Sequence, residues 1–190
     1  MNKPVYVAVE GIDGSGKSTM VPLLAEEMEK LYGRKPLVID EPFTKLNPLL
    51  STARDYQKDR KKHLRQIAKR HKGEWIVSDR SFVSTLAYQP MTSRQFNSIC
   101  RWAKSKHGLG RYYTVLVYLD TDIQTAQKRI WGRPEKMDET DMNLPLQQAV
   151  KRRYDAIAKE RRLFDKIIKC KPGDTAQTIV SNIMSGYILH

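Results

Sequence analysis

A glycine-rich loop near the N-terminus constrains this chain more than any other feature. Residues 11–18 read Gly-Ile-Asp-Gly-Ser-Gly-Lys-Ser, which satisfies the pattern G-x-x-x-x-G-K-[ST]. The apolar run Val5–Val9 precedes this stretch, and a helical pattern begins at Ser18. A strand, a loop and a helix in this order are the context that a phosphate-binding loop requires. A plain strand-turn-helix connection would not need the lysine.

The residue types of this phosphate loop (residues 11–18) explain how it would bind phosphate. Gly11, Gly14 and Gly16 let the backbone curl until successive N–H groups point at phosphate oxygens, and the following helix N-terminus adds positive charge. Lys17 is expected to reach the β- and γ-phosphates of ATP, and the Ser18 hydroxyl to ligate Mg²⁺. The predicted ATP phosphate-binding residues are Gly11, Gly14, Ser15, Gly16, Lys17, Ser18 and Thr19.

Short β-rich runs alternate with helical patterns along the chain, and most of these runs are continuously apolar. Such runs are typical of strands covered on both faces in a parallel sheet. The expected strands are Val5–Val9, Pro36–Ile39, Trp75–Ser78, Thr114–Leu119 and Lys166–Lys169. The expected helices are Ser18–Tyr32, 56–71, Ser84–Lys106, Ile123–Trp131 and Leu146–Glu160. The alternation predicts an α/β fold with a five-stranded parallel sheet flanked by helices.

The charge balance favours anionic partners. Lys and Arg number 34 against 21 Asp and Glu, a formal net charge of +13. Much of this charge lies in residues 58–72 and 151–171, where apolar residues interleave at helical spacing. We interpret these stretches as solvated faces of amphipathic helices, so nucleic acid is not the expected partner.

The apolar runs and the cysteines indicate where the protein is located and whether it binds metal through thiols. No apolar run approaches the roughly 20 residues that span a bilayer, so no transmembrane helix is expected. The first apolar run lacks a signal-peptide cleavage site, which indicates the cytoplasm. Cys100 and Cys170 lie too far apart for a CxxC metal motif and are interpreted as free thiols.

The class of phosphate-loop protein follows by elimination. The base-reading motif N-K-x-D of signalling GTPases is absent, and motors and helicases normally need a chain longer than 190 residues. A small kinase remains, so residues 1–190 are predicted to form a single P-loop kinase domain. The irregular stretch between the last two predicted helices, at about 130–144, is the expected lid.

Several segments resemble the thymidylate kinase family and occur in that family's order, which implies a P-loop fold of the nucleoside monophosphate kinase type. Residues 9–19 are close to that family's phosphate loop, and the resemblance implies that Asp13 contacts the acceptor nucleotide near its sugar. Residues 79–89 resemble the family's Asp-Arg motif followed by Ser-x-x-Ala-Tyr-Gln. There, Arg80 would grip the acceptor phosphate through its planar fork. The resemblance further implies that Asp79 helps to hold Mg²⁺, and that Ser84 and Gln89 read the pyrimidine edge.

Two further segments extend the resemblance. Tyr56 and Arg60 match the family's aromatic-x-x-x-Arg, and a spacing of four puts both on one helical face. Tyr56 would stack on a pyrimidine ring while Arg60 donates to a thymine carbonyl. Arg129 and Arg133, also four apart, lie at the start of the expected lid, where they can share a helical face and reach the transferring phosphoryl group. Because no arginine stands in the phosphate loop, the chain resembles the branch with its catalytic arginine in the lid.

The chain also departs from the family pattern. Residues 40–44, Asp-Glu-Pro-Phe-Thr, stand where the family has Arg-Glu-Pro-Gly-Gly-Thr, so an arginine near the acceptor phosphate is missing. Arg54 is a candidate replacement. In the expected lid, the usual acid-Arg-x-Glu is loosened to Asp-Glu-Thr-Asp at residues 138–141. These departures suggest a divergent member, viral or phage-borne.

Taken as a whole, the resemblance implies a Mg²⁺-dependent kinase that transfers the γ-phosphoryl group of ATP to dTMP and forms dTDP. Its predicted catalytic residues are Lys17, Arg80, Arg129 and Arg133. The family resemblance also suggests a two-fold homodimer, and residues 171–174 are a candidate adenine contact. Two alternatives stay open: a kinase with broader deoxynucleoside monophosphate or deoxynucleoside acceptors, and a basic nucleic-acid-binding P-loop ATPase.

Overall fold

A five-stranded parallel sheet forms the centre of the computed structural model, which describes residues 3–42, 44, 46, 51–71, 73–132, 143–160 and 162–187. The strands lie in the order β2-β3-β1-β4-β5, and every neighbouring pair is parallel. Their bounds are β1 Val5–Glu10, β2 Leu37–Asp40, β3 Ile76–Asp79, β4 Tyr113–Leu119 and β5 Lys166–Cys170. Each strand begins and ends within one residue of its predicted run, so the predicted α/β class and parallel sheet are confirmed.

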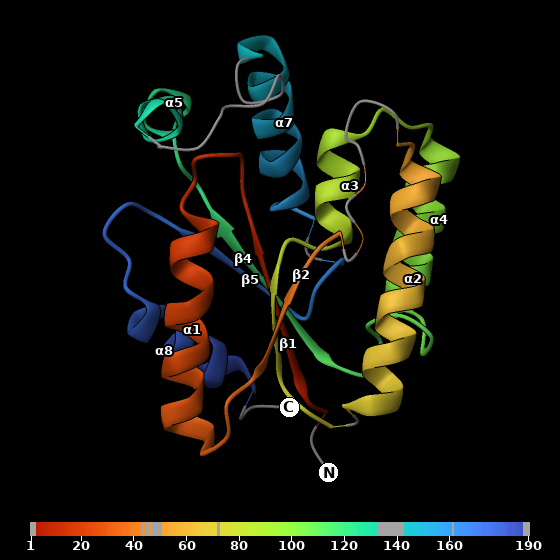
Figure 1. Ribbon diagram of the computed structural model, residues 1–190, viewed down its shortest axis with the longest axis vertical. Coiled ribbons are helices and arrows are strands. Elements are labelled where there is room, and N and C mark those ends of the chain that lie inside the picture. Colours follow the sequence, from red (N-terminus) through yellow and green to blue (C-terminus); the bar gives the residue numbers. More distant parts are fainter. Residues whose placement is uncertain are drawn as a thin grey trace.

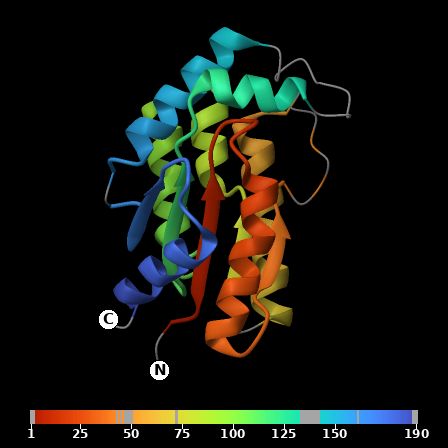
Figure 2. The same ribbon diagram turned by 90° about the vertical axis from the view of Figure 1, so that its left-hand side faces the viewer.

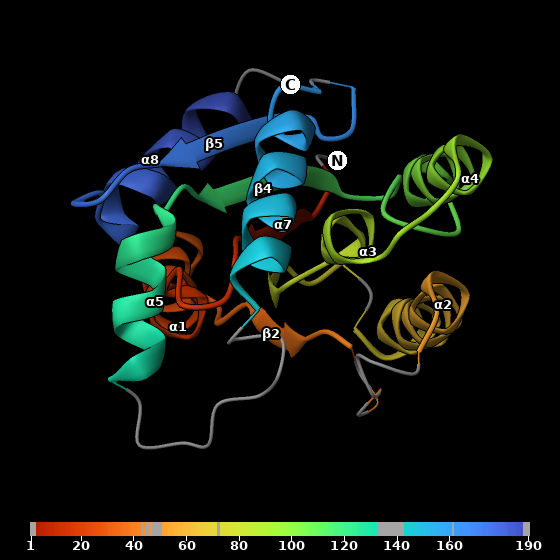
Figure 3. The same cartoon turned by 90° about the horizontal axis from the view of Figure 1, so that it is seen from above.

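Helices cover both faces of the sheet, as Figures 1 and 2 show. Helices α1 (Lys17–Tyr32) and α8 (Ala176–Tyr187) pack on one face. The other face carries α2 (Ala53–Arg70), α3 (Phe82–Tyr88), α4 (Ser93–Lys104) and α7 (Leu144–Ile157). Helix α5 (Ile123–Trp131) lies over the end of the sheet at which the strands finish, as the view from above shows (Figure 3).

The central strand β1 divides its side chains between two hydrophobic clusters because side chains alternate along a strand. Val5, Val7 and Val9 pack toward α1 and α8. Tyr6 and Ala8 belong to the cluster under α2, α3, α4 and α7. All of these side chains are buried, which explains why the strand reads as continuously apolar rather than alternating. Alternation assigns Glu10, the last residue of β1, to the same face as Tyr6 and Ala8.

The expectation of one helix from Ser84 to Lys106 is wrong. The chain forms α3 and α4 instead, separated by residues 89–92. Pro90 has no N–H for a helical hydrogen bond, and it disfavours helical geometry in the residue before it. Thr92 then starts α4 with a capping box closed by Gln95.

Helix α8 was not predicted, although its sequence carries a signal. Ala176, Ile179, Val180 and Ile183 are buried against the sheet at the spacing i, i+3, i+4, i+7. This spacing is the apolar stripe of an amphipathic helix. The pattern therefore would have predicted a helix after the last strand.

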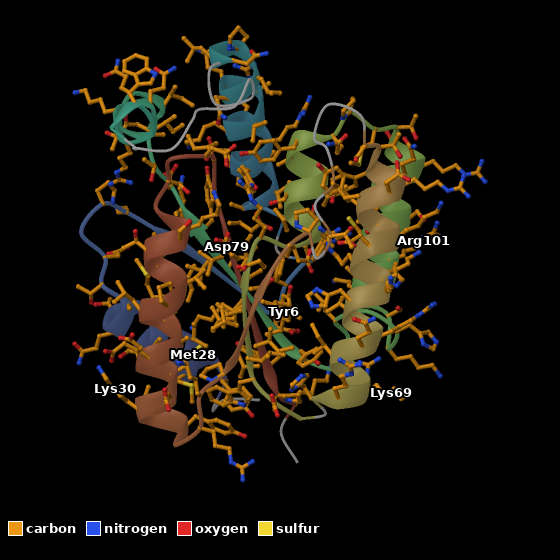
Figure 4. All side chains as sticks on the ribbon, in the orientation of Figure 1. Tyr6, Met28, Lys30, Lys69, Asp79 and Arg101 are labelled. Atoms are coloured by element: carbon orange, nitrogen blue, oxygen red, sulfur yellow. The ribbon has the colours of Figure 1, made fainter. Side chains whose placement is uncertain are left out.

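The parallel strands bring several acidic side chains to one edge of the sheet. Register pairs Val9 with Asp79 and Asp79 with Asp40, so these positions lie level. The phosphate loop leaves β1 at the same edge, at the upper end of Figure 1. Figure 4 shows Asp79 nearer that end than Tyr6. Strand β1 has β3 on one side and β4 on the other, and open α/β sheets bind ligands at such a crossover point.

Candidate active site

The phosphate loop curls tightly and packs directly against α5. Gly14 has a φ of 77°, and a Cβ there would lie 2.3 Å from the carbonyl oxygen of Ala126 on α5. Only glycine can combine this left-handed backbone with so close an approach. The Ser15 N–H donates to the Ile12 carbonyl at 3.1 Å, and α1 begins directly afterwards at Lys17. The loop thus has the strand-loop-helix form that the sequence predicted.

Lys17 lies over the loop with a buried ammonium group. Its Nζ donates to the carbonyl oxygens of Gly11 at 2.9 Å and Ile12 at 3.0 Å. The same atom is 3.9 Å from Asp13 Oδ1. Burial and the nearby Arg80 charge lower the pKa of Lys17 to about 8. At neutral pH, Lys17 therefore still carries a positive charge with which to bind phosphate oxygens.

Asp79 and Ser18, the predicted magnesium ligands, supply oxygen donors near the loop. Asp79 Oδ1 is buried without a hydrogen-bond partner among the described residues, which is costly for a polar atom. Burial raises the pKa of Asp79, against the opposing effects of Lys17 and Arg80. Ser18 is exposed in the first turn of α1. Mg²⁺ commonly binds through one or two protein oxygens together with phosphates and water, so this donor set fits the ion.

No stronger metal site exists in the described part of the chain. Among those residues, no group of three or more His, Cys, Asp or Glu side chains could hold a metal ion. Any metal at this edge would therefore depend on phosphate oxygens for much of its coordination.

Asp13 and Arg80 form an ion pair beside the phosphate loop. Arg80 adopts a left-handed backbone with a φ of 69°, and its guanidinium forms an ion pair with Asp13. The guanidinium also lies over the Tyr88 ring, 5.3 Å from its centroid, and the Tyr88 hydroxyl donates to Asp13 Oδ2 at 2.8 Å. Burial raises the pKa of Asp13, but Arg80 and Lys17 outweigh it and hold that pKa well below its usual range.

Arg60 is buried in contacts within the protein. It forms an ion pair with Glu41, donates to the Ser81 carbonyl at 2.8 Å and to the Thr85 hydroxyl at 3.1 Å. A longer contact of 3.4 Å reaches Gln57 Oε1. Arg60 thus ties α2 to α3, and its predicted contact with a thymine carbonyl stays a prediction.

Tyr56 and Arg54 lie near the beginning of α2. The Tyr56 ring is half-buried; burial raises the pKa of its hydroxyl, and the charge of Arg80 acts in the opposite direction. Tyr56 is therefore close enough to Arg80 to sense its charge. Arg54 is exposed on this helix.

Ser84 and Gln89 are at opposite ends of α3. The Ser84 hydroxyl donates to Glu10 Oε2 at 2.7 Å and lies 3.1 Å from the Tyr154 hydroxyl. Gln89 is half-buried at the C-terminal end of the helix. Glu10, which sequence reasoning did not single out, is the buried partner of Ser84. The sequence signal for Glu10 is an acidic residue at the end of an otherwise apolar strand.

The structure describes one of the two arginines predicted at the lid, Arg129. Arg129 on α5 donates from Nη1 to the carbonyl oxygens of Gly14 at 3.3 Å and Ser15 at 3.2 Å. It therefore braces the phosphate loop through its backbone. Arg133 and most of the expected lid, residues 133–142, lie outside the described residues.

A hollow of about 380 Å³ opens beside the phosphate loop. The loop after β5, residues 171–174, forms one wall, and Arg129 and Thr19 contribute to the others. This loop is the one that the sequence suggested as an adenine contact. The residues that line the hollow are Ser15, Gly16, Thr19, Met20, Leu119, Thr121, Arg129, Cys170, Lys171, Pro172, Gly173 and Asp174.

The parallel sheet, the phosphate loop and the separate cation at Arg80 define a P-loop phosphotransferase of the nucleoside monophosphate kinase type. Comparison with known proteins names the family within this class. The family model for thymidylate kinase matches residues 9–173. The chain belongs to the thymidylate kinase family.

Individual relatives agree with this assignment. The chain is 31% identical over 175 residues to a probable thymidylate kinase of Methanococcus aeolicus, covering 87% of this chain and 83% of that protein. It is also 31% identical over 173 residues to a thymidylate kinase of Coprothermobacter proteolyticus, covering 83% and 87% respectively.

A solved structure shares the fold. The crystal structure of thymidylate kinase from Ehrlichia chaffeensis aligns with a TM-score of 0.66 and 19% sequence identity, over 96% of this chain and 99% of that one. Among the residues that the structure describes, no helix has both the length and the apolar character needed to span a membrane.

Proposed function

We propose that this chain transfers the γ-phosphoryl group of ATP to dTMP and forms dTDP, with Mg²⁺ as the required ion. One observation carries the proposal: Lys17 and Arg80 both lie next to Asp13 Oδ1, with Lys17 Nζ 3.9 Å from this oxygen and Arg80 ion-paired to it. Two cations so placed suit a donor phosphate and an acceptor phosphate that must meet.

ATP binds on the phosphate-loop side in this proposal. The backbone N–H groups of residues 11–19 and the Lys17 ammonium receive its phosphates, and the hollow bordered by residues 171–174 receives its adenine. Ser18 and Asp79 hold Mg²⁺, which when bound neutralises phosphate charge and orients the oxygens. The unpaired oxygen of Asp79 supports this role.

The acceptor nucleotide binds on the Arg80 side. Arg80 binds the dTMP phosphate. Asp13, which forms an ion pair with Arg80 in the structure, contacts the sugar. Tyr56 supplies an aromatic face for the base. Arg60, Ser84 and Gln89 complete the acceptor pocket from α2 and α3.

Catalysis in this proposal relies on positioning and charge rather than on a base. The acceptor phosphate is already ionised near neutral pH, so its oxygen can attack the γ-phosphorus in line. The bond from the γ-phosphorus to the bridging oxygen of the β-phosphate breaks, and ADP leaves with that oxygen. The transition state spreads negative charge over the transferring group, and cations already in place stabilise it. Lys17, Arg80, Arg129 and Arg133 are the proposed sources of that positive charge.

The proposal also covers the domain organisation, the oligomeric state, the location and the partners of the protein. Residues 1–190 act as one kinase domain with a lid at about 130–144, and two copies form a homodimer in the cytoplasm. ATP and dTMP are the proposed partners, and neither a membrane nor a nucleic acid is among them. Neither broader acceptors nor a nucleic-acid-stimulated ATPase has a specific observation in its favour.

The testing experiment is coupled ADP release with ATP and Mg²⁺ against dTMP, dUMP, dCMP, dGMP, dAMP and thymidine. A clear preference for dTMP is the expected result. Comparable rates on several monophosphates would replace the proposal with a broad deoxynucleotide kinase. Turnover with none of them would overturn it.

A further inference from the structure

Glu10 is a fully buried carboxylate whose two oxygens each accept two hydrogen bonds. Oε1 accepts from the Ser81 hydroxyl at 2.8 Å and from the Ser84 backbone N–H at 3.2 Å. Oε2 accepts from the Ser84 hydroxyl at 2.7 Å and from the Tyr154 hydroxyl at 2.8 Å. Burying a carboxylate is costly unless donors surround it, and these four donors satisfy it. A residue so placed fixes the groups that donate to it.

Those groups belong mainly to the first turn of α3. This helix has only seven residues, too few to be stable by itself. Ser81 is its N-cap and accepts from the Val83 N–H at 3.2 Å while donating to Glu10. A negative charge at this end also complements the helix dipole. Glu10 therefore anchors α3 to the end of β1.

Both ends of α3 lead to the acceptor site. Arg80 precedes the N-cap and pairs with Asp13, and Tyr88, the last residue of the helix, donates to the same carboxylate. A shift of this short helix would therefore move two contacts of Asp13 at once.

The backbone of Arg80 needs such an anchor. Its φ of 69° is a strained conformation for a residue with a long side chain. Three contacts hold it: its N–H donates to the Val9 carbonyl at 3.0 Å, its carbonyl accepts from the Ser78 hydroxyl at 2.6 Å, and the following Ser81 is held by Glu10. Releasing Ser81 would let the backbone relax and turn the guanidinium away from Asp13.

We infer that Glu10 is a positioning residue, which holds Arg80 in place for the acceptor phosphate by anchoring the first turn of α3 through Ser81, Ser84 and Tyr154. The inference rests on the proposed function, because it takes Arg80 as the ligand of that phosphate. Tyr154 lies on α7, so the same carboxylate also joins α7 to this arrangement.

The test compares two ligands that differ only in the phosphate, dTMP and thymidine, by isothermal titration calorimetry on the full chain. Glu10→Gln preserves the size of the side chain but replaces an acceptor oxygen with a donor amide. The preference for dTMP over thymidine is expected to fall about tenfold or more, as for the loss of one well-placed charged contact. The dissociation constant for ADP is expected to change less than about threefold. Because Ser84 also belongs to the proposed acceptor pocket, the ratio of the dTMP and thymidine constants is the quantity compared, since it cancels any effect on the base.

Asp165→Asn is the matched control. Asp165 accepts from the Thr114 backbone N–H at 2.7 Å and the Thr114 hydroxyl at 2.8 Å, a similar arrangement at the start of β5, far from the carboxyl edge of the sheet. This variant is expected to lose thermal stability and to retain the wild-type preference for dTMP. If both variants lose the preference for dTMP equally, Glu10 contributes only to the general stability of the protein, and the inference is overturned.

A second variant covers the case in which Glu10→Gln does not fold. Tyr154→Phe removes one of the four donors, and a smaller loss of the dTMP preference is expected. An unchanged preference in every folded variant overturns the inference and leaves the proposed function intact. A wild-type protein that binds dTMP no better than thymidine overturns the assignment of Arg80, and the inference with it.

Discussion

The proposed donor and acceptor sides of the site are built in different ways. The proposed donor side consists mainly of one continuous stretch, residues 11–19, in which backbone N–H groups and a single lysine would bind the phosphates. The acceptor side draws on residues far apart in the sequence, including Asp13, Tyr56, Arg80 and Glu10, joined by hydrogen bonds and ion pairs. A local motif can thus be recognised from its residues, whereas a network exists only once the chain is folded.

This difference predicts how substitutions will behave. Contacts within the phosphate loop are local, so a change there should affect ATP and leave the acceptor pocket in place. Residues that share one network are coupled, so a change on the acceptor side should alter several functions together. Three variants test this contrast, from the largest expected effect to the smallest.

Lys17→Ala should have the largest effect. Removing the ammonium group that meets the donor phosphates is expected to lower kcat by about 10³-fold, as for other charge-stabilising groups. Affinity for dTMP should stay within about threefold of wild type, because a single lost contact outside the acceptor pocket is worth little there. Coupled ADP release and calorimetry with dTMP measure the two quantities. A parallel collapse of dTMP affinity would show that the two sides are not separable.

Arg80→Ala should follow, with about a 10²-fold fall in kcat/KM for dTMP, because both acceptor binding and transition-state charge are lost. The dissociation constant for dTMP should rise about tenfold or more while that for ADP stays unchanged. Arg101→Ala, an exposed arginine on α4 labelled in Figure 4, is the matched control. Normal dTMP affinity in the Arg80 variant would contradict the phosphate assignment.

Arg129→Ala should have the smallest effect of the three. Its guanidinium donates to the carbonyls of Gly14 and Ser15, so its loss loosens the phosphate loop rather than the acceptor pocket. The KM for ATP is expected to rise about tenfold, roughly the value of one charge-assisted hydrogen bond. The value of kcat is expected to fall with the lost transition-state charge, while the KM for dTMP stays unchanged. Initial rates at varied ATP and at varied dTMP separate the two. A rise confined to dTMP would move Arg129 to the acceptor side.

The fold was largely readable from the sequence because its signals are local. Short β-rich runs, most of them continuously apolar, marked each described strand within one residue. The central strands β1 and β4 are buried along their whole length, and strands buried on both faces admit few polar side chains. The exceptions are instructive. The stretch expected as one helix from Ser84 to Lys106 contains Pro90 and forms two helices, and α8 was not among the expected helices despite its regular apolar stripe.

The acceptor network was only partly readable. Arg80 and Asp13 were singled out as separate contacts to the nucleotide, and their ion pair emerged from the fold. Glu10 and Tyr154 carried no recognised role, although they meet in the buried anchor of α3. Their separation of 144 positions leaves no periodic pattern that could join them.

The sequence by itself determined the phosphate loop and the parallel sheet. Both depend on backbone conformation and burial, which neighbouring residues specify: Gly14 permits its turn, and the run from Val5 to Val9 demands a covered strand. The tertiary structure decided which charges meet. Arg80 reaches Asp13, and Tyr154 reaches Glu10, only because parallel strands end at one edge and the helices between them return to it. Such contacts depend on distance in space, which spacing along the chain does not encode.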